Sequence, residues 1–360
     1  MKRIKYITEA SFSFALIIAA NSMAEWHPFV PNAESGLPHL LMELISPLTY
    51  CLTWILCMFI GFFAPASAKG PVAFGALGLI YANMAIVLFR QCGFEIPIEA
   101  NVAGTIANNI GAPLLYLLWE QYFASEDDDQ CIADILVGRG LPVLLFALLG
   151  LISSSSQTMG LRAVILLVAA VALTRCYRSM DWSAPMYAER PLDHRRTYLN
   201  VMVLSWKSAL CIGSLAFLYT VLRSAFTSSN STLNGILTYA PLLGMLAASL
   251  AIMALWQRRS FSFNVIQVFR SLFPFLLCLF AAIPLFATAL PQITYGIAYG
   301  IFSLLVSIGM VQCCQTCKRD GVSPLFMFGF YFGIVNVIQL LGYGFSSILK
   351  TYAFFGQSHG

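Results

Sequence analysis

Long apolar segments dominate the sequence and restrict what the chain can fold into. Of its 360 residues, 59% are hydrophobic and only 10% carry a charge, whereas soluble domains usually have about a quarter charged residues. A chain so poor in charge cannot cover itself with a polar surface. A helix needs about 20 apolar residues to cross the hydrocarbon core of a bilayer. We therefore predict an all-α, polytopic integral membrane protein whose main partner is the lipid bilayer.

Eleven segments of suitable length and composition can be recognised, six before a polar, arginine-rich stretch and five after it. In order, the predicted spans are Ile7–Ala24, His39–Phe63, Pro71–Arg90, Ala100–Tyr122, Leu136–Ser153, Met159–Tyr177, Val201–Arg223, Leu237–Trp256, Val268–Ala289, Ile293–Gln312 and Pro324–Leu349. We expect a 6 + 5 bundle, or a 6 + 6 bundle that lacks its last helix. The domains are then a membrane half over 1–177, a loop over 178–200 and a second half over 201–360.

The arginine-rich stretch Arg175–Tyr198 sets the expected orientation, because loops rich in Lys and Arg stay on the cytoplasmic side. With a cytoplasmic N-terminus, the basic residues Lys69, Arg139, Lys318 and Arg319 all fall on that same side. In this interpretation Arg139 lies at the start of the fifth span. We expect a multi-pass protein of the bacterial inner membrane, with a possible cytoplasmic partner bound through the 178–200 loop.

Polar side chains inside spans are costly in hydrocarbon and usually face a bundle interior. Asn108 and Asn109 lie in the middle of the fourth span, before a helix-kinking Pro113. Such a pair can line a ligand cavity, or one amide can bond a neighbouring helix as structural support. Both interpretations stay open. Glu43, with Tyr50 and Trp54 on nearly the same helical face, forms either an acidic, aromatic ligand surface or part of an interfacial belt.

In the second half, Lys207 lies about two turns into the seventh span. It either extends to the cytoplasmic interface or pairs with an anion. Tyr299, Asn336 and Gln339 complete the candidate ligand-binding set, and the last two share a helical face because they are three residues apart. We predict that these residues line the second half of a central cavity.

No segment matches a nucleotide-binding loop, a nucleophile elbow or a zinc-protease motif, so we predict no enzymatic activity. Cys313, Cys314 and Cys317 have no second Cys/His pair nearby, and structural zinc needs four ligands. We expect no metal and no cofactor. No stretch outside the spans is long enough for a packed DNA-binding domain, so we expect no direct nucleic-acid contact.

Two groups of spans joined by a cytoplasmic loop resemble the layout of the major facilitator superfamily. The loop between the second and third spans reads Ala64–Gly70 (APASAKG), which departs from the Asp- and Arg-containing loop of that family and counts against active transport. The segment Gly104–Phe123 (GTIANNIGAPLLYLLWEQYF) also resembles the membrane part of bacterial LuxR-type regulators. That resemblance implies a small-molecule-sensing module without its DNA-binding domain. The alternative is a facilitator-type secondary transporter of a small organic solute.

Overall fold

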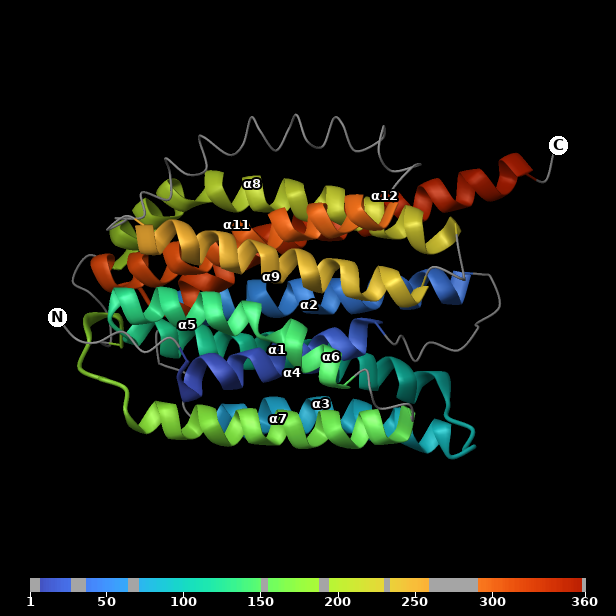
Figure 1. The fold of residues 1–360 in the computed structure, drawn as a ribbon, viewed down its shortest axis with the longest axis horizontal. Coiled ribbons are helices and arrows are strands. Elements are labelled where there is room, and N and C mark those ends of the chain that lie inside the picture. Colours follow the sequence, from blue (N-terminus) through green and yellow to red (C-terminus); the bar gives the residue numbers. More distant parts are fainter. Residues whose placement is uncertain are drawn as a thin grey trace.

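The computed structural model describes residues 7–26, 37–63, 71–149, 155–187, 194–229, 234–258 and 291–357. These residues form α-helices and one short 3-10 turn, with no strand in the described ranges. Figure 1 shows the helices lying side by side along one long axis, with the first half of the chain below and the second half above. The described chain is therefore an all-α bundle, as predicted.

Ten of the predicted spans overlap a described helix, and Val268–Ala289 lies outside the described residues. The helices are α1 (Glu9–Trp26), α2 (Leu37–Phe63), α3 (Pro71–Gln91), α4 (Ile98–Ser125), α5 (Asp128–Gly140), α6 (Pro142–Leu149), α7 (Ser155–Arg178), η1 (Pro185–Tyr187), α8 (His194–Ser229), α9 (Asn234–Arg258), α11 (Pro291–Asp320) and α12 (Pro324–Gln357).

The fifth span differs from its prediction. A single helix over Leu136–Ser153 was expected, but α5 begins at Asp128 and is followed by the separate helix α6. Asp128 and Asp129 lie in the first turn of α5, where carboxylates stabilise the positive end of the helix dipole. The earlier start places Arg139 in the last turn of α5. The prediction that Arg139 stands at the beginning of a span was therefore wrong.

The loop between the halves is shorter than predicted, because α8 begins at His194. Its described part packs on the bundle. The Tyr187 hydroxyl donates to the Gln121 carbonyl at 2.9 Å. Gly321, whose φ of 63° favours glycine, comes next to Pro185. This part of the loop therefore packs against the end of α4 and the residue after α11.

Six described helices are long and apolar enough to cross a membrane; they comprise Leu44–Phe63, Val72–Gln91, Met159–Arg178, His194–Ser224, Gly296–Asp320 and Pro324–Ile348. Large apolar side chains such as Leu56, Val203 and Leu341 point outward and are more than half exposed. Outward apolar side chains are what lipid contact requires. Since α4 carries buried ionisable and amide groups, it is not among the six and needs the cover of its neighbours.

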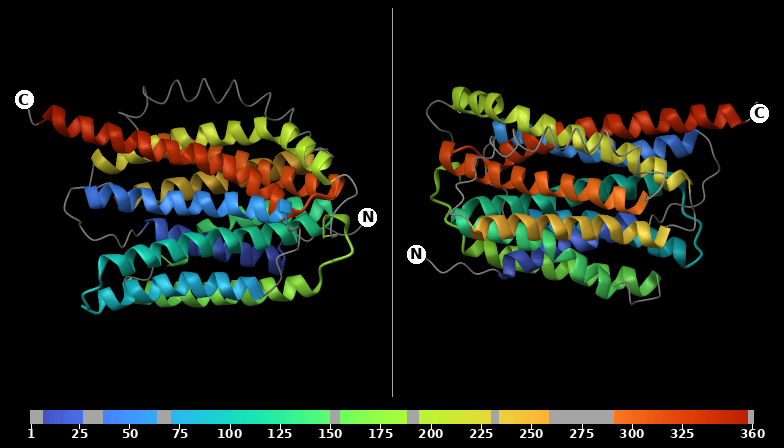
Figure 2. Two further views of the ribbon diagram at one scale, coloured as in Figure 1. Left: turned by 180° about the vertical axis from the view of Figure 1, so that it is seen from behind. Right: turned by 45° about the horizontal axis from the view of Figure 1, so that its top comes forward.

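Helix pairing divides the bundle into two halves. In the first half α3 and α2 pack on α4, and α1 packs on α7 and α5; in the second, α8 packs on α12 and α9 on α11. Between the halves, α2 packs on α12 and α5 on α9, while α4 contacts α11. If the predicted span at 268–289 is counted, the second helix of each half meets the fifth helix of the other. Figure 2 shows α2 against α12 from behind.

Two glycines allow α2 and α12 to touch through their backbones. A Cβ added at Gly329 would lie 2.5 Å from the Met58 amide nitrogen, and one at Gly61 would lie 2.4 Å from the Phe326 nitrogen. Further along, α12 leaves α2 and follows α8, where Gly342 comes close to the Phe217 backbone. The contact between the halves is therefore tightest near the start of α12.

Gly329→Ala is expected to lower the midpoint of thermal unfolding in detergent, because the new methyl group meets backbone atoms that cannot move aside. Overpacking of this kind typically costs about 1–3 kcal/mol. The matched control is Gly344→Ala in the same helix, where a Cβ meets nothing within 4 Å. An unchanged midpoint for Gly329→Ala would contradict the close packing.

Candidate functional site

A buried arginine connects the two halves of the bundle. Arg139, in the last turn of α5, donates from Nη2 to the Ser303 hydroxyl of α11 at 3.1 Å. Its Nη1 lies 3.8 Å from the Met310 sulfur, two turns further along α11. Its Nε is buried and has no hydrogen-bond partner among the described residues. The guanidinium thus contacts the second half but keeps one donor unused.

A buried carboxylate faces the same region. Glu120 of α4 is 3% exposed, and its charge interacts with that of Arg139. Its Oε2 is buried and accepts no hydrogen bond in the described part of the chain. Tyr116 and Tyr299 also interact electrostatically with Arg139. Two buried groups of opposite charge, each with an unsatisfied atom, make a polar centre that favours a further polar partner.

The arginine of the polar centre lies deep in the bundle. Ser303 precedes Lys318, near the end of α11, by fifteen residues, which corresponds to about 22 Å at the rise of an α-helix. The hydrocarbon core of a bilayer is roughly 30 Å thick. The Arg139 guanidinium, which donates to Ser303, therefore lies well inside the membrane-spanning bundle, whereas Glu120 stands six residues before Glu126, about 9 Å from the Lys318 end of the bundle.

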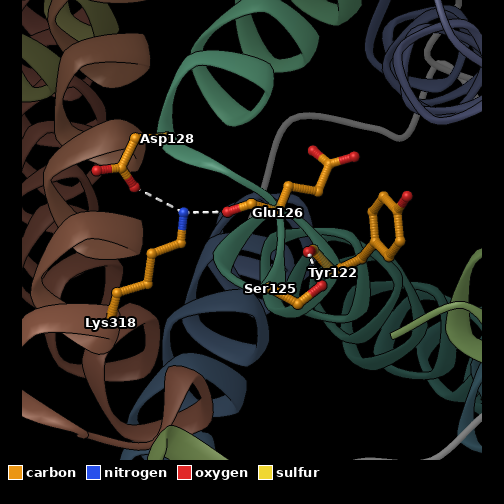
Figure 3. Close-up of polar contacts among 5 residues, drawn as sticks. All are labelled: Tyr122, Ser125, Glu126, Asp128 and Lys318. Atoms are coloured by element: carbon orange, nitrogen blue, oxygen red, sulfur yellow. Dashed lines mark hydrogen bonds and ion pairs between the residues drawn. The ribbon is translucent and has the colours of Figure 1, made fainter. Parts of the chain in front are cut away.

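One end of the bundle, which we call the charged end, is closed by contacts between the halves. Lys318 of α11 reaches the turn between α4 and α5, where Nζ lies 2.7 Å from Asp128 Oδ1 and also donates to the Glu126 main-chain carbonyl (Figure 3). His194, at the start of α8, bonds through Nε2 with the Phe62 carbonyl of α2 at 2.8 Å. We call the Lys318 contacts the Lys318 latch.

Asn109 is used for helix packing. Its Oδ1 accepts from the Ser46 hydroxyl of α2 at 3.2 Å, and its Nδ2 donates to the Thr105 carbonyl one turn earlier. Its own carbonyl accepts from Thr53, also on α2. These bonds favour the structural-support interpretation for Asn109. The neighbouring Asn108 has a buried Oδ1 without a partner in the described residues, so its role stays a prediction.

Tyr50 and Trp54 lie edge to face on α2, with ring centroids 6.3 Å apart. Trp54 is 3% exposed and packs on Phe332 of α12 at 5.4 Å. It therefore belongs to the contact between the halves. The third member of this predicted face, Glu43, lies in α2, but its side chain is outside the described part of the structure.

Lys207 points outward. It is exposed, lies 5.8 Å from the centroid of the Trp206 ring, and shares its helical face with the exposed Val203 and Leu210. This exposed position favours the interpretation in which the Lys207 side chain extends toward the interface over the one in which it pairs with an anion. Tyr299 differs, because it interacts with Arg139 and packs on Tyr219 at 5.0 Å. Of the predicted residues, Tyr299 is the one beside the polar centre.

Asn336 and Gln339 are both half-buried on α12. The Asn336 amide donates to the Phe332 carbonyl of its own helix at 2.7 Å. Such a bond within the helix neither supports nor excludes a ligand contact, so both residues remain predictions.

The sequence interpretation missed the ionisable residues of the polar centre. Glu120 stands two residues inside the predicted fourth span, and its charge in an apolar segment was the signal. Arg139 was missed because the fifth span was started too late. Arg162 of α7 was also missed; it is 5% exposed, and its Nε and Nη2 have no partner among the described residues.

Comparison with known proteins identifies the fold. No family model and no curated protein matches the sequence. A bacterial homologue of the iron transporter ferroportin, in an outward-facing state with soaked iron, matches with a TM-score of 0.65 and 14% identity over 96% of this chain and 92% of its own. The major facilitator superfamily transporter FucP, in its outward conformation, matches with a TM-score of 0.62 and 11% identity over 97% and 92%.

This chain has the major facilitator fold. Both matches extend over the two halves of this chain. At identities this low, the likeness establishes the fold and leaves the transported solute, if there is one, to be argued from the site.

Replacing one charged member of the polar centre should lower the thermal stability more than replacing both. Arg139→Met is expected to lower the midpoint of thermal unfolding, because Glu120 is then buried without a counter-charge. The two groups form no direct ion pair in the described part of the chain, so the expected loss is smaller than the roughly 3–5 kcal/mol of a broken buried ion pair. The double variant Arg139→Met with Glu120→Gln should recover part of the loss. Additive effects of the two substitutions would show that the groups are not coupled.

Proposed function

We propose that this protein is a secondary transporter of the major facilitator type for a small polar organic solute. The observation that carries the proposal is the buried Arg139, bonded across the halves to Ser303, together with the buried Glu120 carboxyl of α4. Buried ionisable groups within membrane-spanning helices usually mark solute or ion pathways. Transporters with two related halves bind their substrates near the midplane, between the halves.

The chemistry of the centre indicates the kind of solute. Arg139 offers an unused N–H donor, which suits a carboxylate or another acceptor group. Glu120 offers an unused acceptor oxygen, which suits a hydroxyl or ammonium donor. Tyr116 and Tyr299 interact electrostatically with the guanidinium and add two further hydroxyl groups to this region. A solute that carries both an acceptor and a donor, such as an amino acid or a hydroxy acid, would satisfy both groups.

Alternating access gives the closed charged end a role. The Lys318 latch and the His194–Phe62 bond join the halves there, while α12 leaves α2 toward the other end. Because Arg175, Lys318 and Arg319 lie at the charged end, we assign it to the cytoplasmic side of a bacterial inner membrane. The described conformation would then face outward, and transport would require the latch to open.

A receptor module remains the second hypothesis, supported by the sequence likeness around Gly104–Phe123 alone. It would use the same polar centre to bind a ligand but would not move it across the membrane. In that case the 178–200 loop would have to pass the signal to a cytoplasmic partner.

The decisive experiment is counterflow in proteoliposomes loaded with unlabelled amino acids, hydroxy acids or sugars. We expect one class to drive uptake of its labelled form, and Glu120→Gln and Arg139→Gln to abolish it while the proteins stay folded. The control is Glu99→Gln at the exposed start of α4. Ligand-dependent thermal stabilisation without counterflow would instead support the receptor hypothesis.

The Lys318 latch can be tested without a known solute. Lys318→Gln removes both latch contacts and is expected to raise the rate at which maleimide alkylates Cys317, which is fully buried one residue away. Peptide mass spectrometry reports this cysteine separately from the others.

Arg319→Gln is the matched control for the latch, because Arg319 pairs with the adjacent Asp320 at 2.8 Å and joins no second helix. Equal alkylation rates in Lys318→Gln, Arg319→Gln and the unchanged protein would show that the latch does not hold the charged end closed.

A further inference from the structure

Two carboxyl groups come together beside the Lys318 latch. Asp134 of α5 is fully buried, and its Oδ1 accepts from the Thr8 hydroxyl at 2.8 Å and from the Gln130 amide at 3.2 Å. Its Oδ2 is buried and has no donor among the described residues. Glu126, the residue directly after α4, has a buried Oε2 that likewise has no donor among the described residues.

The two carboxyl groups lie within hydrogen-bonding reach of each other. An ionised carboxylate is an acceptor only, so a hydrogen bond between two of them requires a shared proton. Two ionised carboxylates in contact also repel, which favours retention of one proton by the pair. The two oxygens without donors are therefore explained if the pair holds one proton.

The surroundings of the pair supply little positive charge. Tyr122 of α4, Cys131 of α5 and Cys176 of α7 are the titratable groups around the pair, and the Tyr122 hydroxyl also hydrogen-bonds the Glu126 carboxyl, which partly offsets the effect of burial on its pKa. Glu9 of α1 interacts electrostatically with Cys176, and the Glu9 carboxylate lies 3.7 Å from the Arg175 guanidinium. Lys318 of α11 is directed at the Asp128 carboxylate and the Glu126 main chain. In the described ranges, no cation forms an ion pair with Glu126 or Asp134.

Glu126 takes part in both the carboxyl pair and the Lys318 latch. Its side chain points away from Lys318, whereas its main-chain carbonyl accepts from Lys318 (Figure 3). The same turn also carries Asp128, the other latch partner. Any displacement of this turn therefore changes the side-chain pair and the latch together.

We propose that Glu126 and Asp134 form a one-proton binding site whose occupancy keeps the Lys318 latch closed. Loss of the proton leaves two negative charges in contact, and their repulsion displaces the α4–α5 turn from Lys318. The proton site stands on its own contacts, while the link to opening of the charged end rests on the proposed transport function.

The direction of the pH dependence follows from the burial of Glu126. Burial raises the pKa of the Glu126 carboxyl to about 9, and the neighbouring Asp134 adds to this effect. A raised pKa means that the protonated form stabilises the fold. This contribution is complete below the ordinary pKa of a glutamate and is lost as the pH rises through the higher value. The charged end should therefore loosen in alkaline solution.

The proton site can be tested by infrared difference titration of the purified full-length protein in nanodiscs. We expect a protonated carboxyl band that disappears in alkaline solution. Glu126→Gln and Asp134→Asn should each remove it at neutral pH, because the introduced amide donates to the remaining carboxylate. Asp129→Asn, an exposed neighbour in the same turn, should leave it unchanged. A band that survives in both variants belongs to another carboxyl group and overturns the proton site.

The link to the latch needs a second measurement. The rate of Cys317 alkylation in the unchanged protein, divided by the rate in Glu126→Gln at the same pH, removes the effect of pH on the thiol itself. We expect this ratio to rise by up to about tenfold per pH unit as the proton is released. If the carboxyl band titrates but the alkylation ratio stays constant with pH, the link between the proton site and the latch is overturned. If the band and the ratio both behave as expected but no solute shows counterflow, the proton site and its link stand and only the transport function is contradicted.

Discussion

The fold depends on how a bundle with very little charge places the ionisable groups that it buries. Each such group must be shielded from lipid, because an isolated charge in hydrocarbon is expensive. The helix that carries Glu120 is packed on α2, α3 and α11. Arg139 is held at the contact of α5 with α11. The order of the helices around α4 is therefore closely tied to the need to enclose these two side chains.

The apolar pattern of the sequence was enough to predict the class of fold and most helix positions. It failed where polar residues are part of a helix. Asp128 and Asp129 look like a loop in an apolar scale, but they begin α5 because their charges suit its N-terminal end. His194, Arg195 and Arg196 likewise look like a linker but form the first turn of α8. Hydropathy alone does not detect a helix that extends beyond the lipid.

The candidate site was harder to predict than the fold. Tyr299 was predicted because it shares a helical face with Tyr295, and whether it binds a ligand stays a prediction, while its electrostatic partner Arg139 was assigned to a helix start. The mid-span Asn109 was chosen for its polarity, yet its side-chain oxygen accepts from Ser46 of α2 and its side-chain nitrogen donates within α4. Polarity in a span thus identifies buried polar groups but does not distinguish packing from function. That distinction needed the positions of partners that lie far apart in the sequence.

The close pairing of α3 with α4 has a consequence for how the protein enters the membrane. With Glu120 and three asparagines, α4 is a poor segment for insertion by itself, since each such residue opposes transfer from the translocation channel into lipid. α3 is strongly apolar and lies against it, with the Ala76 carbonyl beside Gly111 and Asn83 beside Gly104. A short turn at Gly93, with φ of 89°, joins them. During biosynthesis the two helices would therefore leave the channel as one hairpin, with α3 carrying α4 into the bilayer.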